Sequence, residues 1–66
     1  MSSKRKMFID TLVAHRNYLV RTTKSKNAFT VETIISDFDE YDLWDYIKRI
    51  DVDSVSRNIK IVWVGE

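Results

Sequence analysis

The stretch SDFDEYDLWDYIKRI, from Ser36 to Ile50, shows the clearest secondary-structure pattern and predicts a helix from about Phe38 to Ile50. At about 100° per residue its apolar side chains share one arc; they are Leu43, Tyr46, Ile47 and Ile50. Asp37 or Ser36 can accept the free N–H groups at its start, and Glu40 completes a capping box with Asp37. Acidic residues at the start and Lys48 and Arg49 at the end suit the helix dipole. The expected element is an acidic amphipathic helix.

The C-terminal segment from Asn58 to Val64 has the alternation of a strand. Ile59, Ile61 and Trp63 share one face, and Lys60, Val62 and Val64 share the other. Beyond Lys60 both faces are apolar, whereas a strand covered on one side alternates with polar residues. This strand is expected to bury both of its faces.

The middle of the chain allows two interpretations. Residues 28–35 are rich in β-branched side chains and favour a strand, as do residues 18–23, with residues 24–27 as a polar hairpin loop. Val31, Ile34, Ile35 and Phe38 also fit one face of a helix. We prefer the strand because of the β-branching.

The segment Met7–Arg16 is undecided between strand and helix. Phe8, Ile9, Leu12 and Val13 form one helical arc, but basic residues at 4–6 are poorly placed at a helix N-terminus, so we lean to a strand. The predicted fold is α+β. A small antiparallel sheet of three to four strands carries one acidic amphipathic helix, in the order ββ(β)αβ. Residues 1–6 form a basic disordered tail, and residues 7–66 form a single domain.

Size and composition restrict how this fold is stabilised. A chain of 66 residues is one domain with a thin core, and its lack of cysteine excludes disulfides. The single histidine, His15, and the spacing of the aspartates suggest no metal site, and no cofactor is expected. Association with a partner is the remaining way to stabilise so small a fold. No apolar run approaches the roughly 18 residues of a membrane span, and no signal-peptide core is seen, so we expect no membrane contact and a cytoplasmic location.

The charge of the chain is divided between its two halves. Residues 1–26 carry seven lysines and arginines against Asp10, a net charge of +6, and residues 27–66 carry four against nine acidic residues, a net charge of −5. Either the halves neutralise each other locally on folding, or one of them faces a charged partner.

The composition offers few candidate catalytic residues. There is no cysteine nucleophile, His15 stands alone as a base, and Gly65, the only glycine, excludes a glycine-rich phosphate loop. The aspartates are explained by helix capping and a solvated face. We therefore expect a protein that is not an enzyme and has no small-molecule substrate.

Surplus apolar and aromatic surface predicts a protein-binding module that forms a homodimer and regulates or inhibits a larger, unidentified protein. The expected interface residues are Tyr41, Trp44, Val62 and Val64, together with the acidic pair Asp42 and Asp45. The alternative is nucleic-acid binding by the basic half. Its candidate residues are Lys4, Arg5, Lys6, Arg16, Tyr18, Arg21, Lys24 and Lys26.

Overall fold

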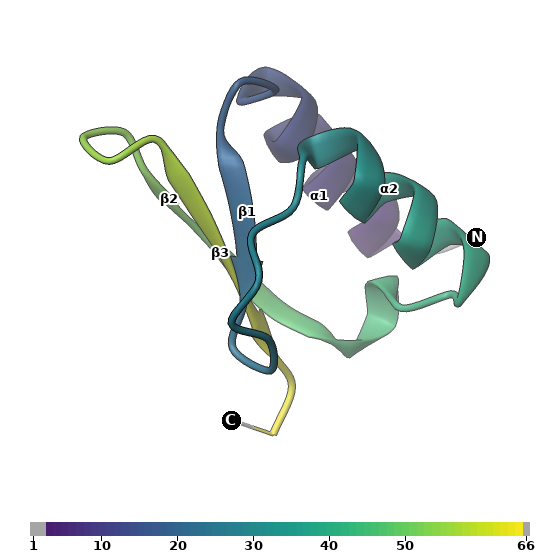
Figure 1. Cartoon of the computed structure of the whole chain (residues 1–66). Coiled ribbons are helices and arrows are strands. Elements are labelled where there is room, and N and C mark those ends of the chain that lie inside the picture. Colours follow the sequence, from purple (N-terminus) through teal and green to yellow (C-terminus); the bar gives the residue numbers. More distant parts are fainter. Residues whose placement is uncertain (1–2, 66) are drawn as a thin grey trace.

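The computed structural model describes residues 3–65, which form two helices, a short 3₁₀-helix and a three-stranded mixed sheet. In chain order the elements are α1 (Ser3–Ala14), β1 (Leu19–Thr22), α2 (Val31–Glu40), η1 (Trp44–Tyr46), β2 (Ile47–Asp53) and β3 (Asn58–Trp63). The strand order is β1-β3-β2, with β1 parallel and β2 antiparallel to β3. Both helices lie on one side of the sheet (Figure 1). The α+β class is confirmed, but the predicted element order and the purely antiparallel sheet are wrong.

The core lies between the two helices and the sheet. The helices contribute Phe8, Leu12, Val31, Ile34 and Phe38, and the sheet and η1 contribute Val20, Trp44, Ile47, Ile59, Ile61 and Trp63. Phe38 joins the two tryptophans, with ring centroids 5.3 Å from Trp44 and 5.4 Å from Trp63. Within residues 3–65, neither helix has the length and apolar character needed to cross a membrane.

The segment Met7–Arg16 is mostly helix, so the preference for a strand is wrong. Phe8 and Leu12, four residues apart, place their side chains on one face and are buried. The basic first turn is stabilised by tertiary contacts that the sequence does not reveal. Arg5 forms two hydrogen bonds with the Asp39 carboxylate, at 2.9 and 3.1 Å, and Lys4 Nζ lies 3.4 Å from the Ile47 carbonyl oxygen. The predicted tail at residues 1–6 is helical from Ser3 onward, and residues 1 and 2 lie outside the described residues.

The second helix occupies part of the segment predicted as a strand at residues 28–35. Thr30 is its N-cap, and its Oγ1 accepts a hydrogen bond from the Thr33 N–H at 3.2 Å. Val31, Ile34 and Phe38 face the core, so the helical interpretation of these residues is the right one. Burial of this face outweighs the weak helix propensity of β-branched side chains.

The predicted helix from Phe38 to Ile50 is wrong. The helix α2 ends at the C-cap Tyr41, and Asp42 has a positive φ of 52°, which a continuing helix does not allow. The single turn of η1 follows, and Ile47 begins β2. From Arg49 to Asp53 charged and apolar residues alternate, with Ile50 and Val52 half-buried, as expected for a strand with one covered face.

The strands β1 and β3 are confirmed at Leu19–Thr22 and Asn58–Trp63. The structure does not contain the hairpin predicted after β1. In its place, Val20 and Phe29 form an isolated antiparallel bridge with two backbone hydrogen bonds of 2.8 Å. In β3 the prediction of two buried faces holds for Val62, which is 6% exposed, while Val64 is 56% exposed.

Candidate protein interface

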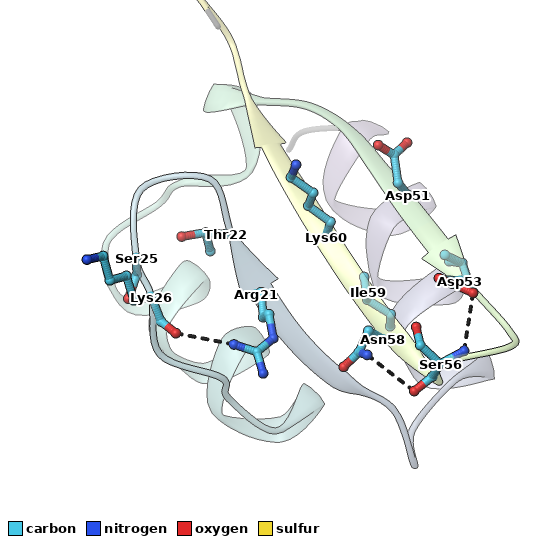
Figure 2. Close-up of a pocket in the computed structure, with 11 residues that line it drawn as sticks. Arg21, Thr22, Ser25, Lys26, Asp51, Asp53, Ser56, Asn58, Ile59 and Lys60 are labelled. Atoms are coloured by element: carbon cyan, nitrogen blue, oxygen red, sulfur yellow. Dashed lines mark hydrogen bonds between the residues drawn. The ribbon is translucent and has the colours of Figure 1, made fainter.

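A broad hollow of about 650 Å³ lies over the sheet and the loop that follows β1 (Figure 2). Arg21 and Lys60 are directly opposite each other in the parallel pair of β1 and β3, and Asp51 of β2 is opposite Lys60 on the other side. Arg21 Nη1 donates to the Lys26 carbonyl oxygen at 3.2 Å. This sheet-face hollow is therefore polar, with cations on the β1 side and carboxylates on the β2 side.

A second depression, of about 450 Å³, has a different chemistry. It is lined by Lys24, Tyr41, Leu43, Tyr46, Trp63 and Val64, and we call it the aromatic groove. Tyr41, Tyr46 and Val64 are 65%, 61% and 56% exposed. The Lys24 ammonium lies 5.3 Å from the centroid of the Trp63 ring, within the range of a cation–π contact. Exposed aromatic and aliphatic groups therefore gather in one place.

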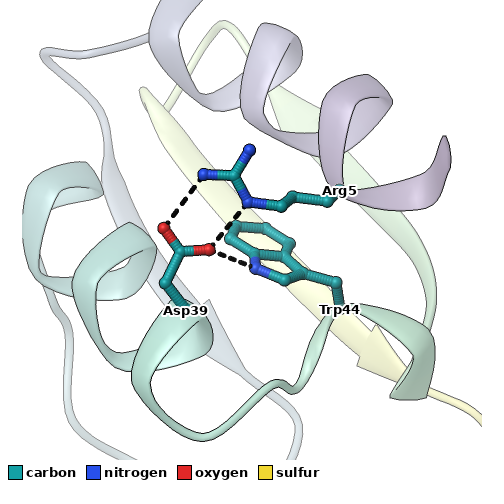
Figure 3. A network of polar contacts seen from close by, with 3 residues as sticks. All are labelled: Arg5, Asp39 and Trp44. Atoms are coloured by element: carbon teal, nitrogen blue, oxygen red, sulfur yellow. Dashed lines mark hydrogen bonds and ion pairs between the residues drawn. The ribbon is translucent and has the colours of Figure 1, made fainter. Parts of the chain in front are cut away.

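A network of polar contacts among Arg5, Asp39 and Trp44 fixes the segment that follows α2 (Figure 3). Trp44 is 2% exposed, and its Nε1 donates to Asp39 Oδ1 at 2.7 Å. The same carboxylate binds Arg5, so Asp39 ties α1, α2 and η1 together. Hydrogen bonds from Arg5 and Trp44 lower the pKa of Asp39, which keeps it charged in the folded protein.

Backbone hydrogen bonds place the groove residues next to one another. The Leu43 N–H donates to the Phe38 carbonyl at 2.9 Å and closes the turn after α2. The Tyr46 N–H donates to Leu43 at 3.0 Å, and the Tyr46 carbonyl accepts from the Val64 N–H at 2.7 Å. The two tyrosines and Val64 are thus presented by short, bonded backbone segments.

Acidic residues flank the aromatic groove in the sequence. Glu40 and Asp42 stand on either side of Tyr41, and Asp45 precedes Tyr46; all three are exposed. Against these carboxylates the groove itself contributes the ammonium of Lys24. Three exposed carboxylates are therefore the immediate sequence neighbours of the groove tyrosines.

The predicted protein-interface residues divide into two groups. Tyr41 and Val64 line the groove, and Asp42 and Asp45 are exposed and next to groove residues in the sequence. Trp44 and Val62, at 2% and 6% exposure, are interior. Trp44 was misplaced because the predicted helix turned it toward solvent.

The predicted nucleic-acid residues are spread over several elements. Arg5, Lys6 and Arg16 form ion pairs with Asp39, Asp10 and Glu32. Lys4 lies in α1, and Tyr18 is half-buried, with its ring centroid 5.0 Å from that of His15. Arg21 and Lys26 line the sheet-face hollow, and Lys24 lines the aromatic groove. The pairs with Asp39 and Glu32 join the basic and acidic halves of the chain.

Sequence reasoning missed three groove residues, namely Leu43, Tyr46 and Trp63, and named Lys24 only for nucleic-acid binding. Leu43 and Tyr46 were assigned to the buried arc of a helix that does not exist. The sequence signal that could have corrected this error was the alternation of charged and apolar residues from Arg49 to Asp53, which indicates a strand. A strand there requires the preceding helix to end earlier, so Tyr46 is no longer part of a buried helical face.

Side chains that could bind a metal ion are not gathered in the described part of the chain. No cluster of three or more histidine, cysteine, aspartate or glutamate side chains is placed to hold a metal ion within residues 3–65. His15 Nδ1 lies 2.8 Å from the Thr11 carbonyl oxygen. Comparison with known protein families, curated proteins and solved structures finds no match for this chain.

Proposed function

We propose that this protein is a non-enzymatic binding module that uses the aromatic groove to hold a segment of another protein. The observation that carries the proposal is the gathering of Tyr41, Tyr46 and Val64, each more than half exposed, around one depression. Tyrosine anchors protein interfaces well, because it buries a large apolar area with few rotatable bonds and ends in a hydroxyl group.

The surroundings of the groove indicate the chemistry of the partner. Glu40, Asp42 and Asp45 are exposed near the two tyrosines. A partner segment with apolar side chains flanked by lysine or arginine is complementary to this surface. By occupying a basic site of a larger protein, the module would act as a regulator or inhibitor of that protein.

A non-enzymatic role agrees with the hydrogen bonds and ion pairs that several carboxylates form within the chain. Asp39 accepts hydrogen bonds from Arg5 and Trp44, and Asp51 forms an ion pair with Arg49 at 3.1 Å. Asp53 accepts the backbone N–H groups of Ser56 and Val55, which lowers its pKa. These carboxylates stabilise turns and contacts between elements.

Affinity capture from the source cell tests the proposal. The bait is the whole chain, compared with the variant Tyr41→Ala/Tyr46→Ala, and each capture is repeated after nuclease treatment. Because interface tyrosines contribute strongly to binding, we expect a protein that the original chain retains and the double variant loses, with no effect of nuclease.

The matched control is Val55→Ala, since Val55 is 98% exposed and lies in the turn between β2 and β3. This variant should capture the same protein as the original chain. Equal capture by the tyrosine variant would contradict the proposal.

A second candidate function, nucleic-acid binding, is favoured by the pairing of Arg21 with Lys60. Like charges directly opposite each other destabilise a sheet, and a phosphate group between them would relieve the repulsion. Lys26 adds a third cation at the same hollow. The candidate site is thus narrower than the basic half of the sequence.

Binding of a single-stranded oligonucleotide at low salt tests this second function. We expect salt-sensitive binding that Arg21→Gln/Lys60→Gln weakens and that Lys6→Gln, on α1, leaves unchanged. Absence of binding at low salt would exclude it.

A further inference from the structure

The outer edge of β2 is open within the described part of the chain. In the order β1-β3-β2, β3 is central and β2 has a strand on one side only. The helices pack mainly against each other, β1 and η1 rather than β2. Strand edges with unpaired backbone groups are templates for pairing with another strand.

The backbone groups that point outward from β2 follow from the hydrogen bonds of β3. The Ile61 carbonyl accepts from the Thr23 N–H beyond the end of β1, whereas the Val64 N–H donates to Tyr46 on the β2 side. Because bonding groups alternate along a strand, the even-numbered residues of β3 face β2. Their partners include Arg49 and Asp51, so Ile50 and Val52 direct their N–H and C=O groups to the open edge.

The charges along this edge are self-complementary. Arg49 and Asp51 lie on the same face of β2, on either side of Ile50, and both are exposed. Within one chain they form an ion pair at 3.1 Å, which pairing with a second copy would exchange for two ion pairs between the copies. If a second β2 pairs antiparallel about a two-fold axis at Ile50, each Arg49 stands opposite Asp51 of the second copy. With the axis at Arg49 the two Arg49 side chains face each other, and with the axis at Asp51 the two Asp51 side chains do, although Arg49 then stands opposite Asp53. The pattern therefore favours the axis at Ile50, the register in which no like charges meet.

We propose that this protein forms a two-fold dimer by antiparallel pairing of β2 with β2 of a second copy, centred on Ile50 and joined by two Arg49–Asp51 ion pairs. The six strands then form one continuous sheet. Ile50, now half-buried against the core, is covered further by its counterpart. The proposal does not depend on the aromatic groove, because Arg49, Ile50 and Asp51 do not line it.

The start of β2 limits the contact. The register between β2 and β3 shifts between Ile47 and Arg49, and Lys4 Nζ lies near the Ile47 carbonyl oxygen. Bulges and lysines are common protections of exposed strand edges. Only the segment from Arg49 onward is therefore available, and such a small interface gives a weak dimer, with a dissociation constant on the order of 10–100 µM.

Sedimentation velocity over about 1 µM to 1 mM protein tests the dimer and its register. We expect reversible dimerisation of the original chain. Arg49→Glu and Asp51→Lys should each weaken it about tenfold or more, because each replaces two attractions by two repulsions. An equimolar mixture of the two variants should form a heterodimer. Across its axis the introduced glutamate of one variant meets the introduced lysine of the other, and the unchanged Asp51 meets the unchanged Arg49.

The matched controls are Lys6→Glu and Asp10→Lys, which change an exposed ion pair on α1 in the same way. Both should dimerise like the original chain, as should Tyr41→Ala/Tyr46→Ala. The exchanged variant Arg49→Asp/Asp51→Arg restores the opposite charges and should form the dimer again. Its recovery would show that the single variants lose the dimer through charge repulsion and not through poor folding. A monomer at the highest concentration, or dimerisation of both single variants to the same extent as the original chain, would overturn the proposal.

Discussion

The two tryptophans make opposite use of the same indole N–H group. Trp44 Nε1 donates to Asp39, while Trp63 Nε1 is buried without a hydrogen-bond partner among the described residues. A buried donor that forms no hydrogen bond loses its hydration without compensation, at about 1–3 kcal/mol. The two residues should therefore respond differently to one and the same substitution.

We expect Trp44→Phe to lower the free energy of unfolding by about 1–3 kcal/mol more than Trp63→Phe. Both changes remove part of an indole ring, so their cavity costs are comparable. Trp44→Phe also leaves the Asp39 carboxylate without one of its donors, whereas Trp63→Phe removes an N–H that has no partner among the described residues. Urea unfolding followed by circular dichroism measures the difference, and equal losses would contradict this account of the two indoles.

The carboxylate of Asp39 makes stability depend on pH. Its pKa is lower in the folded chain than in the unfolded chain, because Arg5 and then Trp44 donate hydrogen bonds to the charged form. Its contribution is therefore complete above the unfolded pKa of about 4 and is lost as the pH falls through the lower folded value. We expect Asp39→Asn to reduce the loss of stability on acidification below about pH 5, as measured by thermal unfolding. Asp53, whose pKa is also lowered, retains part of the effect.

Among the secondary-structure elements, α2 begins several residues earlier than the helix that the sequence predicted. Sequence reasoning placed a helix cap at Asp37 or Ser36, but the structure places it at Thr30, and both residues lie inside the helix. We expect Thr30→Ala to destabilise the protein by about 1 kcal/mol, because Oγ1 no longer accepts the Thr33 N–H. Asp37→Ala should change stability by less than about 0.5 kcal/mol, since a carboxylate late in a helix opposes its dipole. Chemical denaturation compares them, and a larger effect at Asp37 would contradict the assignment.

Clarity of a pattern did not decide whether the prediction was correct. Alternation in residues 58–63 predicted β3 where it lies, whereas the clearest helical pattern, from Phe38 to Ile50, was wrong because α2 ends at its C-cap Tyr41 and β2 begins at Ile47. Other errors arose where two patterns overlap. Val31, Ile34 and Phe38 are β-branched or bulky yet spaced for a helix, and burial against the core decided for the helix. The basic first turn of α1 depends on Asp39, 34 residues after Arg5, and local patterns contain no such contact.

The same overlap determined how much of the aromatic groove was predictable. Tyr41 and Val64 were named because each fell outside an expected apolar face, and both are exposed. Tyr46 was hidden inside a predicted helix, whereas α2 ends several residues before it. Lys24 and Trp63 meet through the parallel pairing of β1 with β3, a topology that adjacent sequence patterns do not specify.

At the scale of the whole molecule, a sheet of three strands has one protected centre and two different edges. The central strand β3 is paired on both sides, and the outer side of β1 is partly closed by the bridge from Val20 to Phe29. Among residues 3–65, no strand closes the edge of β2. The proposed pairing with a second copy would close that edge and extend the sheet without new secondary structure, which would stabilise a chain this short.

Amide hydrogen exchange should reveal this arrangement residue by residue. At low protein concentration we expect slow exchange throughout β3 and an alternation within β2, where the Arg49 and Asp51 amides are protected and those of Ile50 and Val52 exchange quickly. The reason is that the first pair bonds to β3 and the second points to the open edge. Raising the concentration should protect Ile50 selectively, because its N–H group then donates to the Ile50 carbonyl of the second copy, whereas Val52 stands opposite Lys48 in the irregular start of β2. If NMR shows the alternation without any dependence on concentration, the open edge is real but the chain does not pair through it.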